Sequence, residues 1–243
     1  MSRPFLSLII PAYNEESRLP ATLEAVAGYL AGKSYSYEVL VIENGSTDAT
    51  FEIAEAFGQA HPHFRVVQID ERGKGLAIGT GMLAARGEWR MMLDADLSMP
   101  VQEIGRFFPP ALEGYEIAIA SREALGAKRY DEPDFRHIGG RFVNLLIRLL
   151  VLPGIQDSQC GFKSFRGDVA DELFAQQHIE GWAFDVEILY TARQRGYRIA
   201  ELGIPWYYHE FSHVRPIQDT WHMFWDLVRI RLNALRGRYA APD

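Results

Sequence analysis

The sequence predicts an α/β fold built on a mainly parallel sheet with helices on both faces. Two observations lead to this prediction. Short runs of consecutive apolar residues, such as residues 39–42, recur along the first half of the chain, and segments with helical spacing of apolar residues separate them. Strands that are buried on both faces have continuous apolar sequence, whereas half-exposed strands alternate. Such strands alternating with helices are typical of parallel βαβ units.

Five strands and three helices are expected before residue 121. In the first helix, apolar residues recur every three or four positions, which places them on one helical face. The second helix opens with Ser46, Thr47 and Asp48, which are residue types that often begin helices. The expected strands are residues 6–11, 37–43, 64–69, 90–93 and 116–120, and the expected helices are residues 17–31, 47–59 and 76–85.

The 243-residue chain has the composition of an ordinary globular protein, with 48% hydrophobic and 23% charged residues, so disorder is not expected. Its net charge of −7 argues against a nucleic-acid groove, which needs a concentrated basic surface. The single cysteine, Cys160, cannot form an internal disulfide and favours a reducing cytoplasm. No apolar run reaches the roughly 20 residues of a membrane span, and the N-terminus lacks the pattern of a signal peptide.

Two carboxylates follow the fourth predicted strand. Asp94 and Asp96 are separated by one residue, and alternation along a strand would point them in the same direction. Paired carboxylates suit Mg²⁺ or Mn²⁺, and magnesium often shares its remaining positions between water and substrate phosphates. Two solvated acids in a loop are the alternative interpretation of this short pattern.

Polar residues also follow the first two predicted strands, at 11–15 and 43–48. In open parallel sheets, ligands bind beyond the carboxyl ends of the strands. Tyr13 is able to pack against a base, while Glu15 and Glu43 are able to accept hydrogen bonds from base or ribose groups. These strand ends, together with the acid pair, predict a nucleoside-binding site.

A turn of sequence Gly73-Lys74-Gly75 precedes the third predicted helix. Backbone N–H groups at a helix start and one lysine are able to hold a phosphate, although a glycine before a helix is commoner as plain structure. The sequence contains neither G-x-G-x-x-G after the first strand nor G-x-x-x-x-G-K-[ST]. Dinucleotide-binding and P-loop interpretations therefore lose their main support.

Four motifs occur in order: Pro-Ala-Tyr-Asn-Glu at 11–15, Gly-Ser-Thr-Asp at 45–48, Gly-Lys-Gly at 73–75 and Asp-Ala-Asp at 94–96. This series resembles the family 2 inverting glycosyltransferases of the GT-A fold. Within that family it looks most like the dolichyl-phosphate and polyprenyl-phosphate hexose synthases. The similarity extends from about residue 6 to residue 231, which is nearly the whole chain.

The resemblance implies a nucleotide-sugar donor and a divalent metal, Mg²⁺ or Mn²⁺, at Asp94 and Asp96. It assigns Asp96 to metal binding and catalysis, and Asp94 to the ribose or a metal-bound water. Two positions depart from the family pattern, because Glu43-Asn44 stands where Asp-Asp is common and Ser98 where glutamine is frequent. The donor-binding residues implied are Pro11, Ala12, Tyr13, Glu15, Glu43, Lys74 and Asp94.

The second half of the chain has a different pattern. Between residues 137 and 154, basic or polar residues recur every three or four positions among apolar ones, which predicts an amphipathic helix. Such a helix suits a membrane interface, and a core or dimer helix is the alternative. Near the C-terminus, Trp221 and Trp225 fall on an apolar helical face, which suits a membrane boundary or packing against the rest of the protein.

Two further stretches, at 157–163 and 182–187, resemble the acceptor side of the polyprenyl-phosphate glucosyltransferase branch. By that resemblance the acceptor is a lipid phosphate, and Arg122, Arg136 and Arg215 match arginines that hold its phosphate. A phosphate monoester is largely ionised at neutral pH and needs no strong base to attack a sugar. Asp185 stands where related enzymes keep a base, and either a catalytic or a structural role is open for it.

The sequence thus predicts a single GT-A domain over residues 1–243, with a nucleotide-sugar half at 1–120 and an acceptor half at 121–243. The expected reaction moves a hexose, first of all glucose from UDP-glucose, to a polyprenyl or dolichyl phosphate. The expected location is peripheral, on the cytoplasmic face of a membrane, with a membrane-protein partner or self-association left open.

Several alternatives remain. The donor could be GDP-mannose, the acceptor could be a soluble saccharide or a protein, or the domain could bind a nucleotide sugar without turnover. A remote alternative is a zinc hydrolase, because His209-Glu210-x-x-His213 matches a zinc-binding pattern. That chemistry needs a helix, whereas these residues lie between two prolines.

Overall fold

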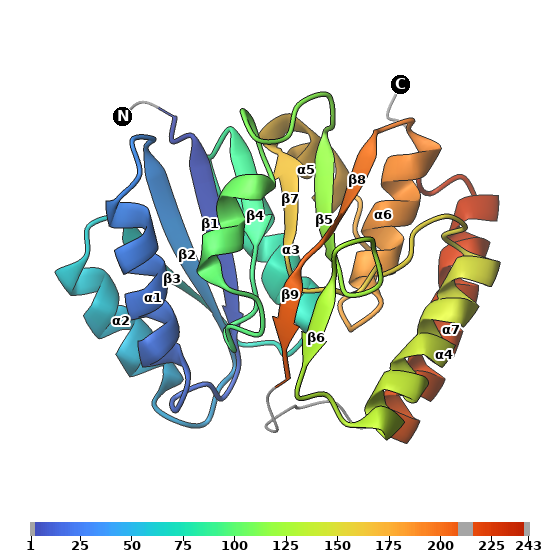
Figure 1. The fold of residues 1–243 in the computed structure, drawn as a ribbon, viewed down its shortest axis with the longest axis horizontal. Helices are drawn as coiled ribbons and strands as arrows, with labels where there is room; N and C mark the ends of the chain where they lie inside the picture. The colour runs from blue at the N-terminus through green and yellow to red at the C-terminus, as the bar shows by residue number, and fades with distance from the viewer. Residues whose placement is uncertain (1–2, 209–215, 241–243) are drawn as a thin grey trace.

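The computed structural model describes residues 3–208 and 216–240, and within these the backbone alone for residues 134–139, 142 and 216–220. Its centre is a seven-stranded sheet with the strand order β3-β2-β1-β4-β7-β5-β8 (Figure 1). The strands are β1 (Leu6–Ala12), β2 (Tyr37–Asn44), β3 (Phe64–Ile69), β4 (Trp89–Met92), β5 (Ile117–Ser121), β7 (Lys163–Arg166) and β8 (Ile199–Gly203).

The sheet is mainly parallel, with one reversed strand. β1, β2, β3 and β4 are parallel to one another, and β5 is parallel to β8. β7 lies between β4 and β5 and is antiparallel to both. In the β4–β7 register, Met92 pairs with Lys163, so the start of β7 meets the end of β4. The segment before β7 therefore reaches the edge of the sheet where the parallel strands end.

Helices cover both faces of the sheet and enclose two apolar cores. One core packs α1 (Leu19–Ala31), α2 (Thr50–Ala60) and the 3₁₀ helix η1 (Val101–Arg106) against the sheet. The other packs α3 (Lys74–Ala84), α5 (Gly167–Phe174) and α6 (Phe184–Gln194) on the opposite face. Buried β1 residues serve both cores, because Leu8 and Ile9 alternate between the two faces.

Two long helices, α4 (Asp134–Leu150) and α7 (Pro216–Leu235), lie side by side at one end of the molecule (Figure 1). A second, two-stranded parallel sheet pairs β6 (Lys128–Tyr130) with β9 (Pro205–Tyr207). The N–H of Tyr207 donates to the carbonyl of Ser98 at 2.8 Å. This bond fixes the small sheet beside the loop that follows β4.

The predicted fold class is confirmed, and all five predicted strands are present. Several predicted boundaries differ by one to three residues, and two of these differences have a clear physical reason. α2 begins at Thr50 rather than residue 47, because the residues before it bond to the loop after β1. β4 ends at Met92, so Asp94 and Asp96 lie in a turn and not on the strand. The local pattern did not predict β6, β7, β8, η1, α5 or α6.

Candidate active site

The loops after β1 and β2 are joined by reciprocal hydrogen bonds. The N–H of Asn14 donates to Ser46 Oγ at 3.0 Å, and the N–H of Thr47 donates to Asn14 Oδ1 at 2.8 Å. The N–H of Glu15 donates to Thr50 Oγ1 at 2.7 Å. Asn14 has a φ of 52°, a left-handed conformation that asparagine tolerates better than most residues. These bonds form a fixed rim where the two strands end.

Tyr13 projects from this rim towards a cation that the sequence did not single out. The guanidinium of Arg72 lies 4.9 Å from the centre of the Tyr13 ring. Pro11 and Ala12 form the last two residues of β1 directly before it. An aromatic ring and a guanidinium plane both suit stacking against a nucleobase. Arg72 stands one residue before the Gly-Lys-Gly motif, and that adjacency was the available signal.

Glu15 and Glu43 are both buried and bonded within the same rim. Glu15 Oε2 accepts from Arg18 Nε at 2.7 Å. Glu43 Oε1 accepts from the N–H of Ser46 at 2.5 Å. Both carboxylates, which the sequence predicted to bind the donor, thus hold the shape of the loops at this rim.

The acid pair lies in the turn after β4. Thr22 Oγ1 donates to the carbonyl of Ala95 at 2.6 Å, and the N–H of Ser98 donates to Asp96 Oδ1 at 2.9 Å. Leu97, which follows Asp96, has a φ of 53°, a conformation that costs free energy for a residue with a branched side chain. The turn is thus held from α1 and from its own backbone.

Lys74 lies in the first turn of α3, and its Nζ is 2.6 Å from Asp94 Oδ1. Burial alone would lower the pKa of Lys74, but the carboxylates of Asp94, Asp185 and Asp96 outweigh burial and raise it. Burial would likewise raise the pKa of Asp94, but the cations of Lys74, Lys163 and Arg122 hold it below its ordinary value. Both groups are therefore charged at neutral pH.

The loop before α6 fixes the position of Lys74. The N–H of Leu76 donates to the carbonyl of Glu180 at 3.1 Å. A Cβ atom on Gly73 would lie 2.6 Å from that carbonyl oxygen, and a Cβ on Gly75 would lie 2.7 Å from the carbonyl oxygen of Ile179. The Gly-Lys-Gly motif is therefore required for close packing of two backbones.

Trp182 belongs to the same loop and is the first residue of the 182–187 stretch, in which the sequence predicted a role for Asp185 only. Its ring centre lies 5.3 Å from Lys74 Nζ, and 38% of the residue is exposed. An exposed tryptophan beside a charged cluster offers an apolar ring face to a bound molecule. Its place within the 182–187 stretch was the available signal.

The 157–163 segment packs directly against Asp94 of the acid pair. Gly161 lies so close to Asp94 that a Cβ atom built on it would be 1.9 Å from Asp94 Oδ2. The reversed direction of β7 brings the segment to this edge of the sheet. Residues far apart in the sequence, assigned by resemblance to donor and acceptor, therefore meet at Asp94.

Lys163 and Asp185 form a buried ion pair beneath the site. Lys163 Nζ lies 2.7 Å from Asp185 Oδ1 and donates to the carbonyl of Cys160 at 2.5 Å. Burial raises the pKa of Asp185, although Lys163 and Lys74 oppose this shift. Burial also raises the pKa of the Cys160 thiol to about 12. Cys160 is therefore protonated at neutral pH and is a poor nucleophile.

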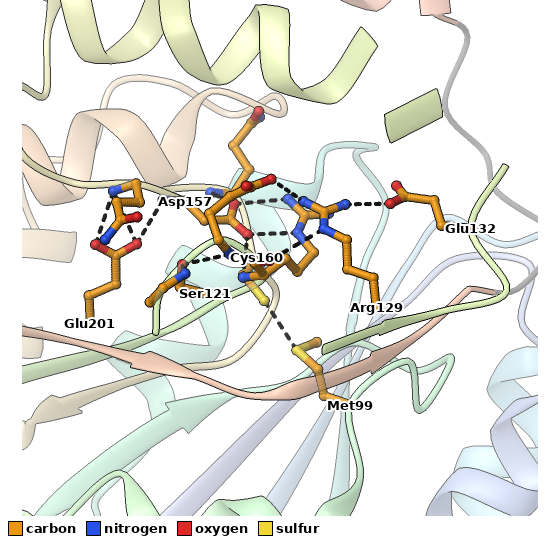
Figure 2. A network of polar contacts seen from close by, with 12 residues as sticks. Met99, Ser121, Arg129, Glu132, Asp157, Cys160 and Glu201 are labelled. Carbon is orange, nitrogen blue, oxygen red and sulfur yellow. Dashed lines mark hydrogen bonds and ion pairs between the residues drawn. The ribbon is translucent and has the colours of Figure 1, made fainter. Parts of the chain in front are cut away.

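Arg122 is bound by Asp157 in a two-pronged ion pair. Its Nε and Nη2 donate to Asp157 Oδ2 and Oδ1 at 2.7 and 2.9 Å. Figure 2 shows Asp157 between Glu201, which accepts from the N–H of Asp157 at 2.8 Å, and Arg129, which bonds to Glu132. The guanidinium of Arg122 also lies 5.5 Å from the centre of the Trp206 ring. Arg122 is partly exposed, at 22% of its side chain.

The other predicted phosphate ligands are described only in part. Arg136 lies in α4, but its side chain is outside the described residues. Arg215 lies outside the described residues altogether, and so do His209, Glu210 and His213 of the zinc-binding pattern.

The acid pair fits a divalent metal that shares its coordination with a substrate. Magnesium commonly takes one or two protein carboxylates and completes its shell with water and phosphate oxygens. In the part of the chain that the structure describes, no group of three or more His, Cys, Asp or Glu side chains is arranged as a metal site. Two carboxylates near the cations Lys74, Lys163 and Arg122 match a metal site completed by substrate better than a site made of protein ligands alone.

Solved structures with the same architecture define the class of fold. A glucosyl-3-phosphoglycerate synthase from Mycobacterium tuberculosis in complex with UDP matches 99% of this chain and 82% of its own, with a TM-score of 0.68 and 20% identity. The same enzyme with Mn²⁺, UDP-glucose and phosphoglyceric acid matches 99% and 81%, with a TM-score of 0.66 and 20% identity. The chain has the GT-A fold of glycosyltransferases.

Sequence comparison gives the family. The model of glycosyl transferase family 2 matches residues 7–174. The dolichyl-phosphate beta-glucosyltransferase of Dictyostelium discoideum is 35% identical over 96% of this chain and 76% of its own. The human enzyme of that name is 34% identical over 96% and 77%, and the Saccharomyces cerevisiae enzyme is 30% identical over 97% and 76%. The chain belongs to glycosyl transferase family 2.

Proposed function

We propose that this glycosyltransferase moves glucose, with inversion, from UDP-glucose to a polyprenyl or dolichyl phosphate. Relatives named dolichyl-phosphate beta-glucosyltransferase, which match nearly the whole chain, support the sugar and the acceptor. The observation that carries the proposal is the contact between Gly161 and Asp94. It joins the segment that resembles the acceptor side of these enzymes to the acid pair of the donor side.

We assign donor binding to residues 1–120 and acceptor binding to residues 121–243, which together act as one domain. Tyr13 and Arg72 offer a ring face and a guanidinium plane on which the base stacks. Pro11, Ala12, Glu15 and Glu43 shape the rim on which the nucleoside rests. Lys74, at the start of α3, contacts the diphosphate, because a helix N-terminus and an ammonium both favour anions.

Asp94 and Asp96 would hold Mg²⁺ or Mn²⁺. A divalent ion bound there supplies positive charge to the departing nucleoside diphosphate. The UDP-bound and metal-bound forms of the M. tuberculosis synthase, which shares the fold, are consistent with this assignment. Of the two, Asp96 is the stronger candidate for the metal ligand, because Asp94 is already ion-paired with Lys74.

The acceptor phosphate oxygen attacks the anomeric carbon, and the bond from that carbon to the diphosphate oxygen breaks. An ionised phosphate needs no deprotonation before the attack. Arg122, together with Arg136 and Arg215, would place the acceptor in line with the leaving group. We assign Asp185 a structural role in positioning the acceptor segment, because its carboxylate is buried and ion-paired with Lys163.

The paired helices α4 and α7 would bring the enzyme to a lipid surface on the cytoplasmic side. They carry exposed apolar residues, and α7 exposes two tryptophans, which favour a membrane interface. Within the described part of the chain, no helix combines the length and apolar character that crossing a membrane requires. The exposed residues are Leu145, Leu149, Leu150, Trp221, Phe224, Trp225, Leu232 and Leu235.

The test is nucleotide release from a panel of UDP- and GDP-sugars with Mg²⁺ or Mn²⁺, with and without a short-chain polyprenyl phosphate. Release from UDP-glucose that requires both metal and lipid phosphate is the expected result. A phosphate-free polyprenol and a soluble phosphate ester serve as acceptor controls. Release that is independent of the lipid phosphate, or that requires another donor, would overturn the proposed reaction.

A further inference from the structure

Lys74 and the proposed divalent metal would both contact the Asp94 carboxylate. Lys74 Nζ lies 2.6 Å from Asp94 Oδ1. The backbone at Gly161 also packs closely against this carboxylate, since a Cβ atom built there would lie 1.9 Å from Oδ2. A divalent ion that uses Asp94 would therefore share a confined carboxylate that Lys74 already contacts.

Lys74 is held in this place by the fold. It stands between two glycines that pack against the backbone of residues 179 and 180, and the carbonyl of Glu180 accepts from the N–H of Leu76. The Trp182 ring lies 5.3 Å from the ammonium. The start of α3 is thus fixed, and movement of the ammonium is left to the flexible side chain.

The charges around Asp94 make the competition between Lys74 and a divalent ion for this carboxylate strong. A lysine ammonium and a divalent ion within contact distance of one carboxylate repel each other, and the repulsion is strengthened where water is partly excluded. Lys163 adds a second cation nearby, which is fully buried and paired with Asp185. The nucleoside diphosphate of a donor brings negative charge that is able to accept the Lys74 ammonium and complete the metal shell.

We propose that Lys74 is an internal counter-ion that competes with the divalent metal for Asp94, so that metal binds tightly only together with the nucleotide. This inference rests on the proposed function, which supplies the metal and the diphosphate. Nucleotide binding moves Lys74 from Asp94 to the diphosphate and frees the carboxylate oxygen. Metal and nucleotide affinities are then coupled, and the coupling is reciprocal.

Equilibrium Mn²⁺ binding, measured by electron paramagnetic resonance with and without UDP, tests the inference without turnover. In the wild-type protein, UDP should tighten Mn²⁺ binding at least tenfold. Lys74→Met should bind Mn²⁺ at least tenfold more tightly than wild type when UDP is absent, and should lose most of the UDP effect. Lys74→Arg keeps the charge and should bind Mn²⁺ as weakly as wild type without UDP.

Lys33→Met is the matched control. It removes one positive charge from the exposed residue that stacks on Tyr29 beyond the end of α1, and its Mn²⁺ binding should equal that of wild type. Circular dichroism and thermal melting establish that each variant is folded. Unchanged Mn²⁺ affinity in a folded Lys74→Met protein would overturn the inference and leave the proposed reaction standing. Failure of the wild type to bind Mn²⁺ even with UDP would overturn both, because the metal assignment itself would be wrong.

Discussion

At the scale of single residues, Gly161 decides how closely the two halves of the site approach each other. We predict that Gly161→Ala lowers the glucosyl transfer rate by about 100-fold, because the added methyl group would displace the Asp94 carboxylate from its place between Lys74 and the backbone. A displacement of about 1 Å at a reacting centre has an effect of this size. Steady-state assays of nucleotide release measure it.

The control for this substitution is Gly28→Ala, because a Cβ placed on Gly28 in α1 would meet nothing within 4 Å apart from the adjacent backbone of its own helix. That change should leave activity unaltered and should stabilise the helix by up to about 1 kcal/mol. Full activity of Gly161→Ala would show that Asp94 has freedom to move without loss of function.

The Asp157–Arg122 pair gives a second prediction at this scale. Burial would raise the pKa of Asp157, but the Arg122 guanidinium overrides burial and lowers the pKa to about 2. Asp157→Asn should therefore destabilise the protein by on the order of 3 kcal/mol, because a largely buried guanidinium loses its counter-ion. The 22% exposure of the Arg122 side chain argues for the lower end of such costs. Urea unfolding at pH 7 measures the change.

The same pair sets an acid dependence. The folded pKa of about 2 lies below the ordinary value of 3.8, so the stabilisation is complete above pH 4 and is lost as the pH falls towards 2. A shift of this size corresponds to about 2 kcal/mol. The free energy of unfolding of Asp157→Asn should therefore change less than that of wild type between pH 4 and pH 2. Parallel pH curves for the two proteins would contradict the assignment.

The sequence identified the site residues that carry motifs, but it did not identify their partners. Asp94, Lys74 and Asp185 stand in short recognisable patterns, whereas the pairing of Asp94 with Lys74 and of Asp185 with Lys163 depends on distances between separate segments. Arg72 and Trp182 were missed as site residues for the same reason, since an aromatic or cationic residue in a loop has no periodicity that indicates where it lies.

At the scale of elements, buried Glu187 joins α6 to two neighbouring segments. Its Oε2 accepts from the N–H groups of His178 and Ile179 at 2.9 and 2.8 Å, and its Oε1 accepts from the hydroxyl of Tyr239 at 2.7 Å. The first two bonds hold the loop that fixes Lys74. The third links this loop to the segment that follows α7.

We predict that Tyr239→Phe loosens the 178–184 loop. The substitution leaves the buried Glu187 carboxylate without one of its three partners and should cost about 1 kcal/mol of stability. Hydrogen exchange followed by mass spectrometry should show faster exchange in peptides that cover residues 178–184. Tyr115→Phe changes an exposed residue and should leave the exchange of this loop as in wild type; equal exchange in all three proteins would show that the loop does not depend on Tyr239.

The prediction of helices and strands was correct where the local sequence pattern is long and regular. The strands from β1 to β5 were found from consecutive apolar residues, because such runs are buried whichever strand lies beside them. The reversed direction of β7 was not predictable, since strand direction depends on connections and not on local composition. β6 and β9 have three residues each, too few to show any period.

At the scale of the whole molecule, charge is unevenly distributed. The chain has a net charge of −7, yet residues 140–150 of α4 and 221–238 of α7 with its tail contain six arginines and a single acid, Asp226. These segments also carry the exposed leucines and tryptophans of the two helices. An acidic protein with one basic, aromatic face is oriented by an anionic surface, because the rest of the molecule is repelled from it.

We therefore predict binding to vesicles that contain anionic lipid, measured by flotation at low and high salt. The double variant Trp221→Ser, Trp225→Ser should bind about tenfold less tightly, because both indoles are more than half exposed on α7 and favour the interface. Binding of the wild type should weaken as salt screens the arginines. Leu83→Ser alters a half-exposed apolar residue of α3, outside the two helices, and should bind vesicles as wild type does. Equal loss in Leu83→Ser and the double variant would assign the binding to general surface hydrophobicity instead of to the face formed by α4 and α7.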